Sequence, residues 1–173
     1  GLAGQSIGHG IIVDFSKYMN QILEINAQEG WARVQPGVVC DALLNAVKKH
    51  GYSFGTEPAS SNRATIGGMI ANNSTGAHSV MYGMTADHIL EADVYLSDGW
   101  RGKFSSLDAN SLNAKLESQT REGELYRGIK GIVEKNADAI KDRFPKTWRR
   151  ASGYSLNYMI PPHGYVASRP AVW

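Results

Sequence analysis

The chain has 173 residues, of which 42% are hydrophobic and 20% charged, as is typical of a soluble globular domain with its own core. Its 18 Lys and Arg residues and 16 Asp and Glu residues give a formal net charge of +2, so the charge balance predicts no nucleic-acid partner. The single cysteine, Cys40, excludes an internal disulfide, and one thiolate is too few for a zinc site or an iron–sulfur cluster. We therefore expect no metal within the chain.

The sequence shows neither a membrane span nor a secretion signal. No apolar run approaches the roughly 20 residues that cross a bilayer, and the first residues lack the basic-then-apolar pattern of a signal peptide. Together with the single cysteine, these features predict a cytoplasmic protein. Residues 1–4 and 168–173 both have the composition of loops that break off, so we expect a domain truncated at both ends.

The first third of the chain predicts strands. Residues 11–15 form a short apolar run rich in β-branched side chains, which indicates a buried strand. Residues 22–25 and 31–34 flank an Asn- and Gly-containing segment at residues 26–30. Such a segment suits a tight turn between antiparallel strands, so we predict a hairpin here.

A helix and a long loop come next. Residues 42–50 place apolar side chains at helical spacing, with Asp41 before them, basic residues in the last turn and Gly51 beyond. Residues 53–84 are mostly small and polar and keep no sustained period, so we expect a long ordered loop with one helical turn. Long loops of this kind are usually functional.

The second half of the chain predicts a hairpin followed by helices. The expected elements are a strand at residues 88–96, a turn at 97–99, a strand at 100–104, a polar helix at 112–118 and the longest helix at 123–144, ended by Pro145. No internal repeat or low-complexity tract is present.

The strongest functional signal lies in a Gly- and Asn-rich stretch at residues 64–83. Its glycines and small side chains let backbone N–H groups converge on one ligand, as a diphosphate requires, without net positive charge. The two common phosphate motifs, G-x-x-x-x-G-K-[ST] and G-x-G-x-x-G between a strand and a helix, are absent. The residues alone leave an ordinary surface loop as an equal alternative.

Several motifs in a fixed order carry a family resemblance. They are Pro58-Ala59-Ser60, then Ala64-Thr65-Ile66-Gly67-Gly68-Met69, then Asn72-Asn73-Ser74-Thr75-Gly76, then Tyr82-Gly83, then Asp87-His88-Ile89-Leu90 and Ser97-Asp98-Gly99. This series resembles the FAD-binding domain of the vanillyl-alcohol oxidase and p-cresol methylhydroxylase superfamily. It is most similar to the bacterial branch of FAD-linked D-lactate, glycolate and D-2-hydroxyglutarate dehydrogenases.

The resemblance implies a set of FAD contacts. Residues 1–6 resemble the end of the family's first diphosphate loop, and Ile89 would contact the adenosine side through its backbone. The implied cofactor-binding residues are Gly4, Gln5, Ser6, Pro58, Ala59, Ser60, Thr65, Ile66, Gly67, Gly68, Asn72, Ser74, Gly76, Tyr82, Gly83 and Ile89. For Thr65 and Ser74 the alternative is a hydroxyl that caps local N–H groups, and for Ile89 it is burial in a strand.

A second signature at residues 145–156 resembles the long members of this branch, in which an iron–sulfur domain follows the flavin domain. The resemblance therefore implies an iron–sulfur cluster only in a C-terminal part beyond this chain. Arg149 or Arg150 could bind a substrate carboxylate by a bidentate hydrogen bond, although a solvated basic pair is the more ordinary interpretation. None of the five histidines has catalytic or metal-binding spacing, so no catalytic base is predicted.

The fold predicted is α+β, an antiparallel-rich sheet flanked by helices, of the FAD-binding p-cresol methylhydroxylase type. Residues 1–16 would be the remnant of a first subdomain, 17–160 a second subdomain, and 161–173 a linker toward a substrate domain. The implied activity is oxidation of a small D-2-hydroxy acid by hydride transfer to FAD. The electrons would then pass to an iron–sulfur, quinone or cytochrome acceptor. The full-length protein would lie in the cytoplasm at the periphery of the inner membrane. Two alternatives stay open, namely a non-catalytic interaction module and another oxidoreductase of the superfamily, such as a sugar oxidase or a cell-wall precursor reductase.

Overall fold

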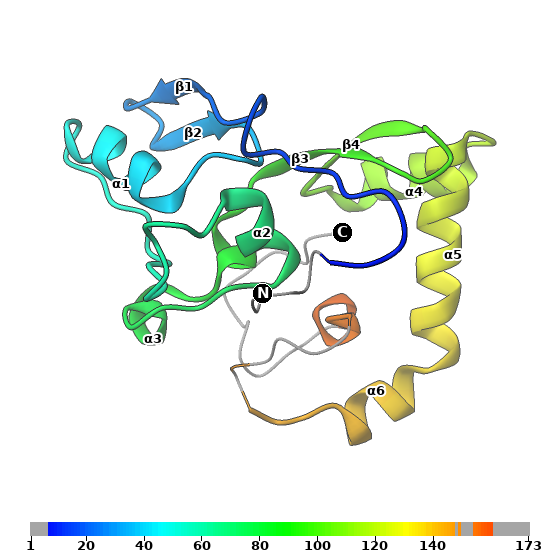
Figure 1. Cartoon of the computed structure of the whole chain (residues 1–173). Helices are drawn as coiled ribbons and strands as arrows, with labels where there is room; N and C mark the ends of the chain where they lie inside the picture. The colour runs from blue at the N-terminus through cyan, green and yellow to red at the C-terminus, as the bar shows by residue number, and fades with distance from the viewer. Residues whose placement is uncertain (1–6, 148, 150–153, 161–173) are drawn as a thin grey trace. The chain divides into compact units, whose positions relative to one another are not determined.

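The chain forms two compact units, residues 1–88 and residues 89–173. The structure, a computed structural model, describes residues 7–147, 149 and 154–160 (Figure 1). The predicted α+β class is confirmed, and the strands form two separate two-stranded antiparallel sheets. The subdomain boundaries expected after residues 16 and 160 stay a prediction. Within the described residues, no helix combines the length and the apolar character needed to cross a membrane.

The predicted hairpin in the first unit is confirmed. Strand β1 (Ile22–Asn26) pairs antiparallel with strand β2 (Trp31–Val34). The Asn26 side-chain oxygen accepts hydrogen bonds from the N–H groups of Gln28 and Glu29, at 3.1 and 3.0 Å, which closes the turn. Gly30 follows with φ +74°, a backbone conformation that glycine adopts without steric cost.

Two helices build the core of the first unit. Helix α1 (Cys40–Lys48) confirms the predicted helix, beginning two residues earlier, and helix α2 (Ile66–Ala71) lies in the segment expected to be mostly loop. Apolar side chains at helical spacing on α1 and at the first turn of α2 face the same interior. The buried cluster contains Val38, Cys40, Leu43, Val47, Ile66 and Met69.

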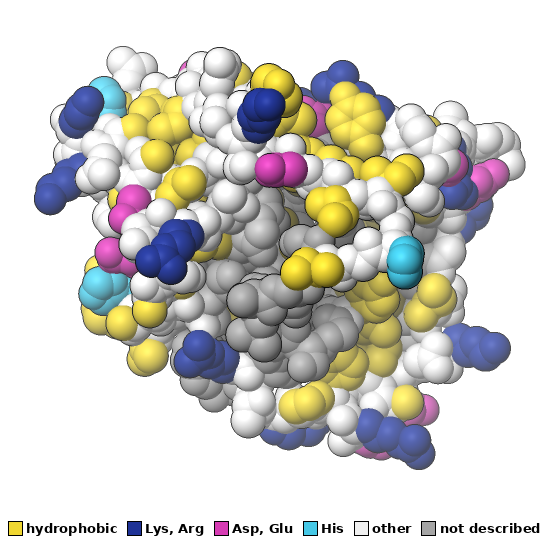
Figure 2. All heavy atoms as spheres, viewed as in Figure 1, with side chains coloured by type: hydrophobic (Ala, Val, Ile, Leu, Met, Phe, Trp, Pro, Cys, Tyr) yellow, Lys and Arg dark blue, Asp and Glu magenta, His cyan; other side chains and the backbone are white. Residues whose placement is uncertain are grey.

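The buried strand predicted at residues 11–15 is wrong. The run belongs to no strand, and its side chains are exposed, with Ile11 at 93% and Val13 at 65%. Hydrophobic side chains of this N-terminal segment are visible on the surface in Figure 2. The composition of a strand is present, but no described residue supplies the neighbouring strand whose backbone groups it would pair with.

The second unit begins with the other predicted hairpin. Strand β3 (Glu91–Tyr95) starts three residues later than expected, because a short 3₁₀ helix, η1 (Thr85–His88), ends the first unit. It pairs antiparallel with strand β4 (Arg101–Ser105), and Gly99 in the predicted turn has φ +82°. Both strands alternate exposed and half-buried side chains, as expected of a sheet with one solvated face.

Three helices follow. Helix α4 (Ala109–Glu117) confirms the predicted polar helix. The single long helix predicted for residues 123–144 is wrong, because it is divided into α5 (Arg121–Lys135) and α6 (Ala137–Arg143). At this junction the Asn136 backbone leaves the helical conformation, with φ −114° and ψ 16°. Its side chain donates to the Ile132 carbonyl at 2.7 Å, beside the backbone N–H of Asn136, which donates to the same carbonyl at 3.2 Å.

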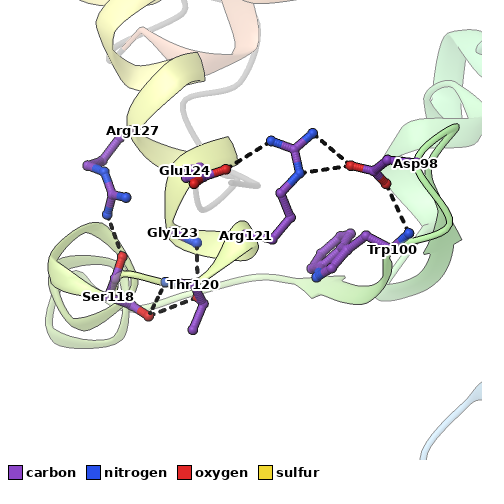
Figure 3. Close-up of polar contacts among 8 residues, drawn as sticks. All are labelled: Asp98, Trp100, Ser118, Thr120, Arg121, Gly123, Glu124 and Arg127. Carbon is purple, nitrogen blue, oxygen red and sulfur yellow. Dashed lines mark hydrogen bonds and ion pairs between the residues drawn. The ribbon is translucent and has the colours of Figure 1, made fainter.

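Polar side chains fix the start of α5 (Figure 3). The Thr120 hydroxyl accepts a hydrogen bond from the Gly123 N–H at 3.3 Å and caps the helix. Arg121 pairs with Asp98 in the β3–β4 turn at 2.9 Å and with Glu124 at 3.0 Å. Arg127 donates to the Leu116 and Ser118 carbonyls at the end of α4. The turn, α4 and α5 are therefore joined through side chains as well as through the chain.

Replacing Asp98 by Asn is expected to reduce the stability of the second unit at neutral pH and to leave it unchanged in strong acid. Hydrogen bonding from the Trp100 N–H, followed by the Arg121 contact, lowers the pKa of Asp98 below its usual value. A carboxyl group with a lowered folded-state pKa stabilises the protein above the unfolded-state pKa, about 3.9, and loses this effect as pH falls through the folded value. Urea midpoints measured from pH about 2 to about 7 test this, because the series must extend below the lowered pKa of Asp98. Asp142→Asn, on the exposed surface of α6, is the control and should leave the urea midpoint at pH about 7 close to that of the wild type.

Candidate cofactor site

The glycine-rich segment, residues 53–84, is anchored to the start of α1. Val39 and Thr65 form an isolated antiparallel bridge at the residues that immediately precede α1 and α2. Three backbone hydrogen bonds flank this bridge, at 2.8 to 2.9 Å: Cys40 N to Ala64 O, Ile66 N to Val38 O and Gly67 N to Pro36 O. The segment is therefore ordered by backbone pairing, although it contains little regular structure.

The segment holds more helix than the single turn expected. Besides α2 it contains helix α3 (Ser79–Tyr82), which ends at Gly83 with φ +88°. Thr65 caps α2, because its hydroxyl accepts a hydrogen bond from the Gly68 N–H at 3.4 Å. The capping alternative for Thr65 is therefore observed.

The predicted FAD contacts in this segment differ in exposure. Five present an accessible surface, one is buried, and the rest are half-buried. The exposed residues are Ala59, Ser60, Gly68, Asn72 and Tyr82; the half-buried ones are Pro58, Thr65, Gly67, Ser74, Gly76 and Gly83; the buried one is Ile66.

Three of these residues have a clear structural role. The Ile66 side chain belongs to the core, so only its backbone could contact a ligand. A Cβ on Gly67 would lie 2.7 Å from the Pro36 Cβ, and one on Gly76 would lie 1.9 Å from the Glu57 carbonyl oxygen. Both glycines therefore allow two parts of the chain to pass in close contact.

The structure does not test the remaining predicted contacts. Gly4, Gln5, Ser6 and Arg150 lie outside the described residues. Ile89 is half-buried at the start of the second unit, and the exposed Arg149 belongs to the same unit. Their roles stay predictions.

Sequence reasoning missed the residue that shapes the end of α2. Asn73 has φ +44°, and its side-chain oxygen accepts a hydrogen bond from the Ala86 N–H at 3.0 Å. Its amide nitrogen also contacts the Met84 sulfur at 3.7 Å. Asn tolerates positive φ better than most residues, so the Asn72-Asn73 pair was the available signal, but nothing in the sequence shows which of the two adopts it.

His88 also contributes to the architecture of the segment. Its ring lies edge-on to Phe54, with centroids 5.3 Å apart, and a Cβ on Gly55 would lie 2.8 Å from its Cε1. Burial lowers the pKa of His88, partly opposed by a backbone hydrogen bond at Tyr82. Its buried Nε2 makes no hydrogen bond to a described residue. His88 therefore packs the beginning of the segment against its end.

No group of three or more potential metal ligands occurs in the part of the chain that the structure describes.

Cys40 is fully buried, and burial is the main cause that raises the pKa of its thiol to about 11. A thiol with this pKa is almost entirely protonated at neutral pH and is a poor nucleophile.

We therefore expect Cys40 to resist modification while the protein is folded. At pH about 8, Ellman's reagent should modify the urea-unfolded chain completely. Over the same time it should modify only a small fraction of the folded protein. Rapid modification of the native protein would contradict the burial of Cys40, and a Cys40→Ser variant gives the zero-thiol baseline.

Comparison with known proteins identifies the family. The family model described as "FAD binding domain" matches residues 1–102, which include the whole glycine-rich segment. D-2-hydroxyglutarate dehydrogenases of Pseudomonas putida and Escherichia coli are 43% and 40% identical over 95% and 92% of this chain. The glycolate oxidase subunit GlcD of Bacillus subtilis is 40% identical over 79% of it.

This chain spans only 16% of the two dehydrogenases and 28% of the glycolate oxidase subunit. The matched segment nevertheless contains the motifs on which the FAD expectation rests, from Pro58 to Gly83. The predicted cofactor class is thereby confirmed, and the chain belongs to the FAD binding domain family.

Proposed function

We propose that the protein carrying this chain is an FAD-dependent dehydrogenase that oxidises a small 2-hydroxy acid of the 2-hydroxyglutarate, lactate or glycolate type. One observation carries the proposal: similarity to the D-2-hydroxyglutarate dehydrogenases continues through 92–95% of this chain, beyond the FAD-family match that ends at residue 102. The second unit is therefore similar to these dehydrogenases as well. A chain that shared only the FAD-binding fold with them would not need to be similar there.

The residues of the glycine-rich segment fit a dinucleotide. Ala59, Ser60, Gly68 and Asn72 are all exposed and small, so a ligand can approach the backbone closely along this surface. The side chains of Ser60 and Asn72 make no hydrogen bond to another described residue, so both are available as donors. These residues, with Gly4, Gln5 and Ser6 of the first loop, would hold the diphosphate.

When bound, the flavin would supply the two-electron acceptor for the hydride of the hydroxy acid's α-carbon, while a base outside this chain would take the hydroxyl proton. The role of this chain is then to bind the cofactor and fix its orientation through the anchored backbone of residues 58–76. Arg149 and Arg150 are candidates for the substrate carboxylate. We place the electron acceptor, an iron–sulfur centre, a quinone or a cytochrome, outside this chain, and the protein in the cytoplasm with peripheral contact to the inner membrane.

A turnover assay tests the proposed activity. The protein expressed from its complete gene, loaded with FAD, is mixed with D-2-hydroxyglutarate, D-lactate or glycolate and an artificial dye acceptor. We expect dye reduction with at least one of these three acids. For 2-hydroxyglutarate and lactate, which are chiral, we expect none with the L-enantiomer. 2-Hydroxyglutarate is the first candidate because the relatives with that name match the largest share of the chain.

Anaerobic mixing without a dye gives an independent measurement. A true substrate should bleach the oxidised flavin absorbance in a single turnover. Stoichiometric FAD binding without bleaching by any hydroxy acid would contradict the substrate class and favour a sugar oxidase or a cell-wall precursor reductase. Absence of any FAD binding would favour the non-catalytic interaction module.

A further inference from the structure

The glycine-rich segment carries very little fixed charge. Among residues 53–84, all of which the structure describes, the only carboxylate is Glu57 and the only Lys or Arg is Arg63. A dinucleotide diphosphate is negatively charged on both phosphates. Arg63 is therefore the permanent positive charge that this segment can offer to such a ligand, and most of the other contacts would come from neutral donors.

Glu57 and Arg63 differ in whether a side chain of opposite charge lies nearby. Glu57 lies beside His78, whose Nδ1 is 3.7 Å from the carboxylate oxygen. His78 in turn contacts the edge of the Tyr82 ring, with centroids 6.5 Å apart. Arg63 is exposed and pairs with no carboxylate among the described residues. The guanidinium of Arg63 is therefore available to a ligand.

The backbone that carries Arg63 is held in place. The N–H groups of Arg63 and Ala64 both donate to the Ser60 carbonyl at 2.8 Å, which closes a tight turn. This turn is fixed to α1 because the Asp41 N–H donates to the Ser61 carbonyl at 3.1 Å. The start of the Arg63 side chain therefore has a defined position before any ligand binds, and less backbone entropy is lost on binding.

The immediate surroundings of Arg63 permit close approach. Ala59 and Ser60 precede it as small exposed residues, and Gly68 is exposed on α2, which begins three residues after Arg63. We propose that Arg63 is a cofactor-binding residue whose guanidinium forms charged hydrogen bonds with the FAD diphosphate. The proposal rests on the FAD-dependent function above. Guanidinium groups suit this role because their planar donors match phosphate oxygens in pairs.

The test compares Arg63→Gln with Arg63→Lys and with Lys49→Gln in the protein expressed from its complete gene. Lys49 is an exposed cation at the end of α1 in the same unit, so its variant removes the same charge elsewhere. Dissociation constants are measured for FAD, ADP and riboflavin at several salt concentrations, after circular dichroism confirms that each variant is folded.

We expect Arg63→Gln to raise the dissociation constants of FAD and ADP by about 10-fold or more, in line with the loss of a charged hydrogen bond, and to leave that of riboflavin unchanged. Its FAD affinity should also depend less on salt. Arg63→Lys should recover part of the affinity, and Lys49→Gln should match the wild type.

Equal FAD affinity of wild type and Arg63→Gln would overturn the proposal. If the variant with unchanged FAD affinity also had a raised KM for the hydroxy acid, Arg63 would instead bind the substrate carboxylate. A wild-type protein that binds no FAD would also refute it. By contrast, FAD binding that depends on Arg63 without turnover of any hydroxy acid would support this inference and refute the proposed substrate class.

Discussion

Replacing Gly76 by Ala is expected to destabilise the first unit by about 3 kcal/mol and to abolish FAD binding. An added Cβ would lie 1.9 Å from the Glu57 carbonyl oxygen and 2.3 Å from the carbonyl carbon. Both neighbours are backbone atoms, so the clash cannot be relieved by rotation of a side chain. The backbone near Glu57 or near Gly76 must therefore move. These two stretches of the chain include the proposed flavin contacts at residues 58–60 and 72–76.

Thermal unfolding and flavin absorbance measure the two parts of this prediction separately. Gly8→Ala is the matched control, because an added Cβ there meets no atom within 4 Å. The control should keep the wild-type melting temperature and cofactor content. A Gly76→Ala protein with wild-type stability would show that the contact between residues 57 and 76 is not tight in the native protein.

Two glycines of α5 are expected to respond in opposite directions to the same substitution. Alanine is favoured over glycine in a helix by about 0.8–1.0 kcal/mol. At Gly128 an added Cβ meets nothing within 4 Å, so Gly128→Ala should stabilise the second unit by up to about 1 kcal/mol. At Gly123 the Cβ would lie 2.1 Å from the Ser118 carbonyl oxygen and 2.8 Å from that of Lys115, so Gly123→Ala should destabilise it by about 1–3 kcal/mol.

The comparison is made by urea unfolding of the two single variants and the double variant. The sites are five residues apart on one helix, and only Gly123 adjoins the α4–α5 connection, so their effects should be close to additive. Stabilisation by both substitutions would mean that helix propensity alone decides the outcome. Destabilisation by both would point to a constraint on Gly128 from a part of the protein outside this chain.

Local sequence signals predicted the elements whose determinants lie within a few residues. The β1–β2 hairpin follows from Asn26 and Gly30, which close its turn through their own backbone and side-chain chemistry. Helix α1 follows in the same way from Asp41 in its first turn, the apolar residues at helical spacing and the basic residues near its end. In such cases the residue type and the required conformation are directly linked.

Signals that depend on a distant partner were less reliable. Residues 11–15 have the composition of a buried strand, but strand formation needs a neighbour that the sequence does not identify. The break at Asn136 was overlooked because Asn within a helical pattern is ordinary, and the sequence does not show that its backbone leaves the helical conformation.

The cofactor class was predicted from the sequence, whereas the location of the site in residues 58–83 stays a prediction. The sequence could not show that Ile66 faces the core or that Gly67 and Gly76 pack against Pro36 and Glu57. The two glycine contacts join residues 31 and 19 positions apart in the chain. It also did not single out Arg63, since an arginine in a loop is unremarkable until its neighbours are known to leave it unpaired.

The Val39–Thr65 bridge has a consequence for how the protein folds. Helices α1 and α2 both start beside this bridge, and the 25 residues between the two helix starts form a closed loop. The ends of this loop must meet before the hydrogen bonds that join the two helix starts can form. Helix α1 and the cofactor-binding surface are then expected to open and close as one cooperative unit. Amide protons of Cys40 and Ile66, which donate across this closure, should exchange with solvent at matching rates, and cofactor binding should slow both together.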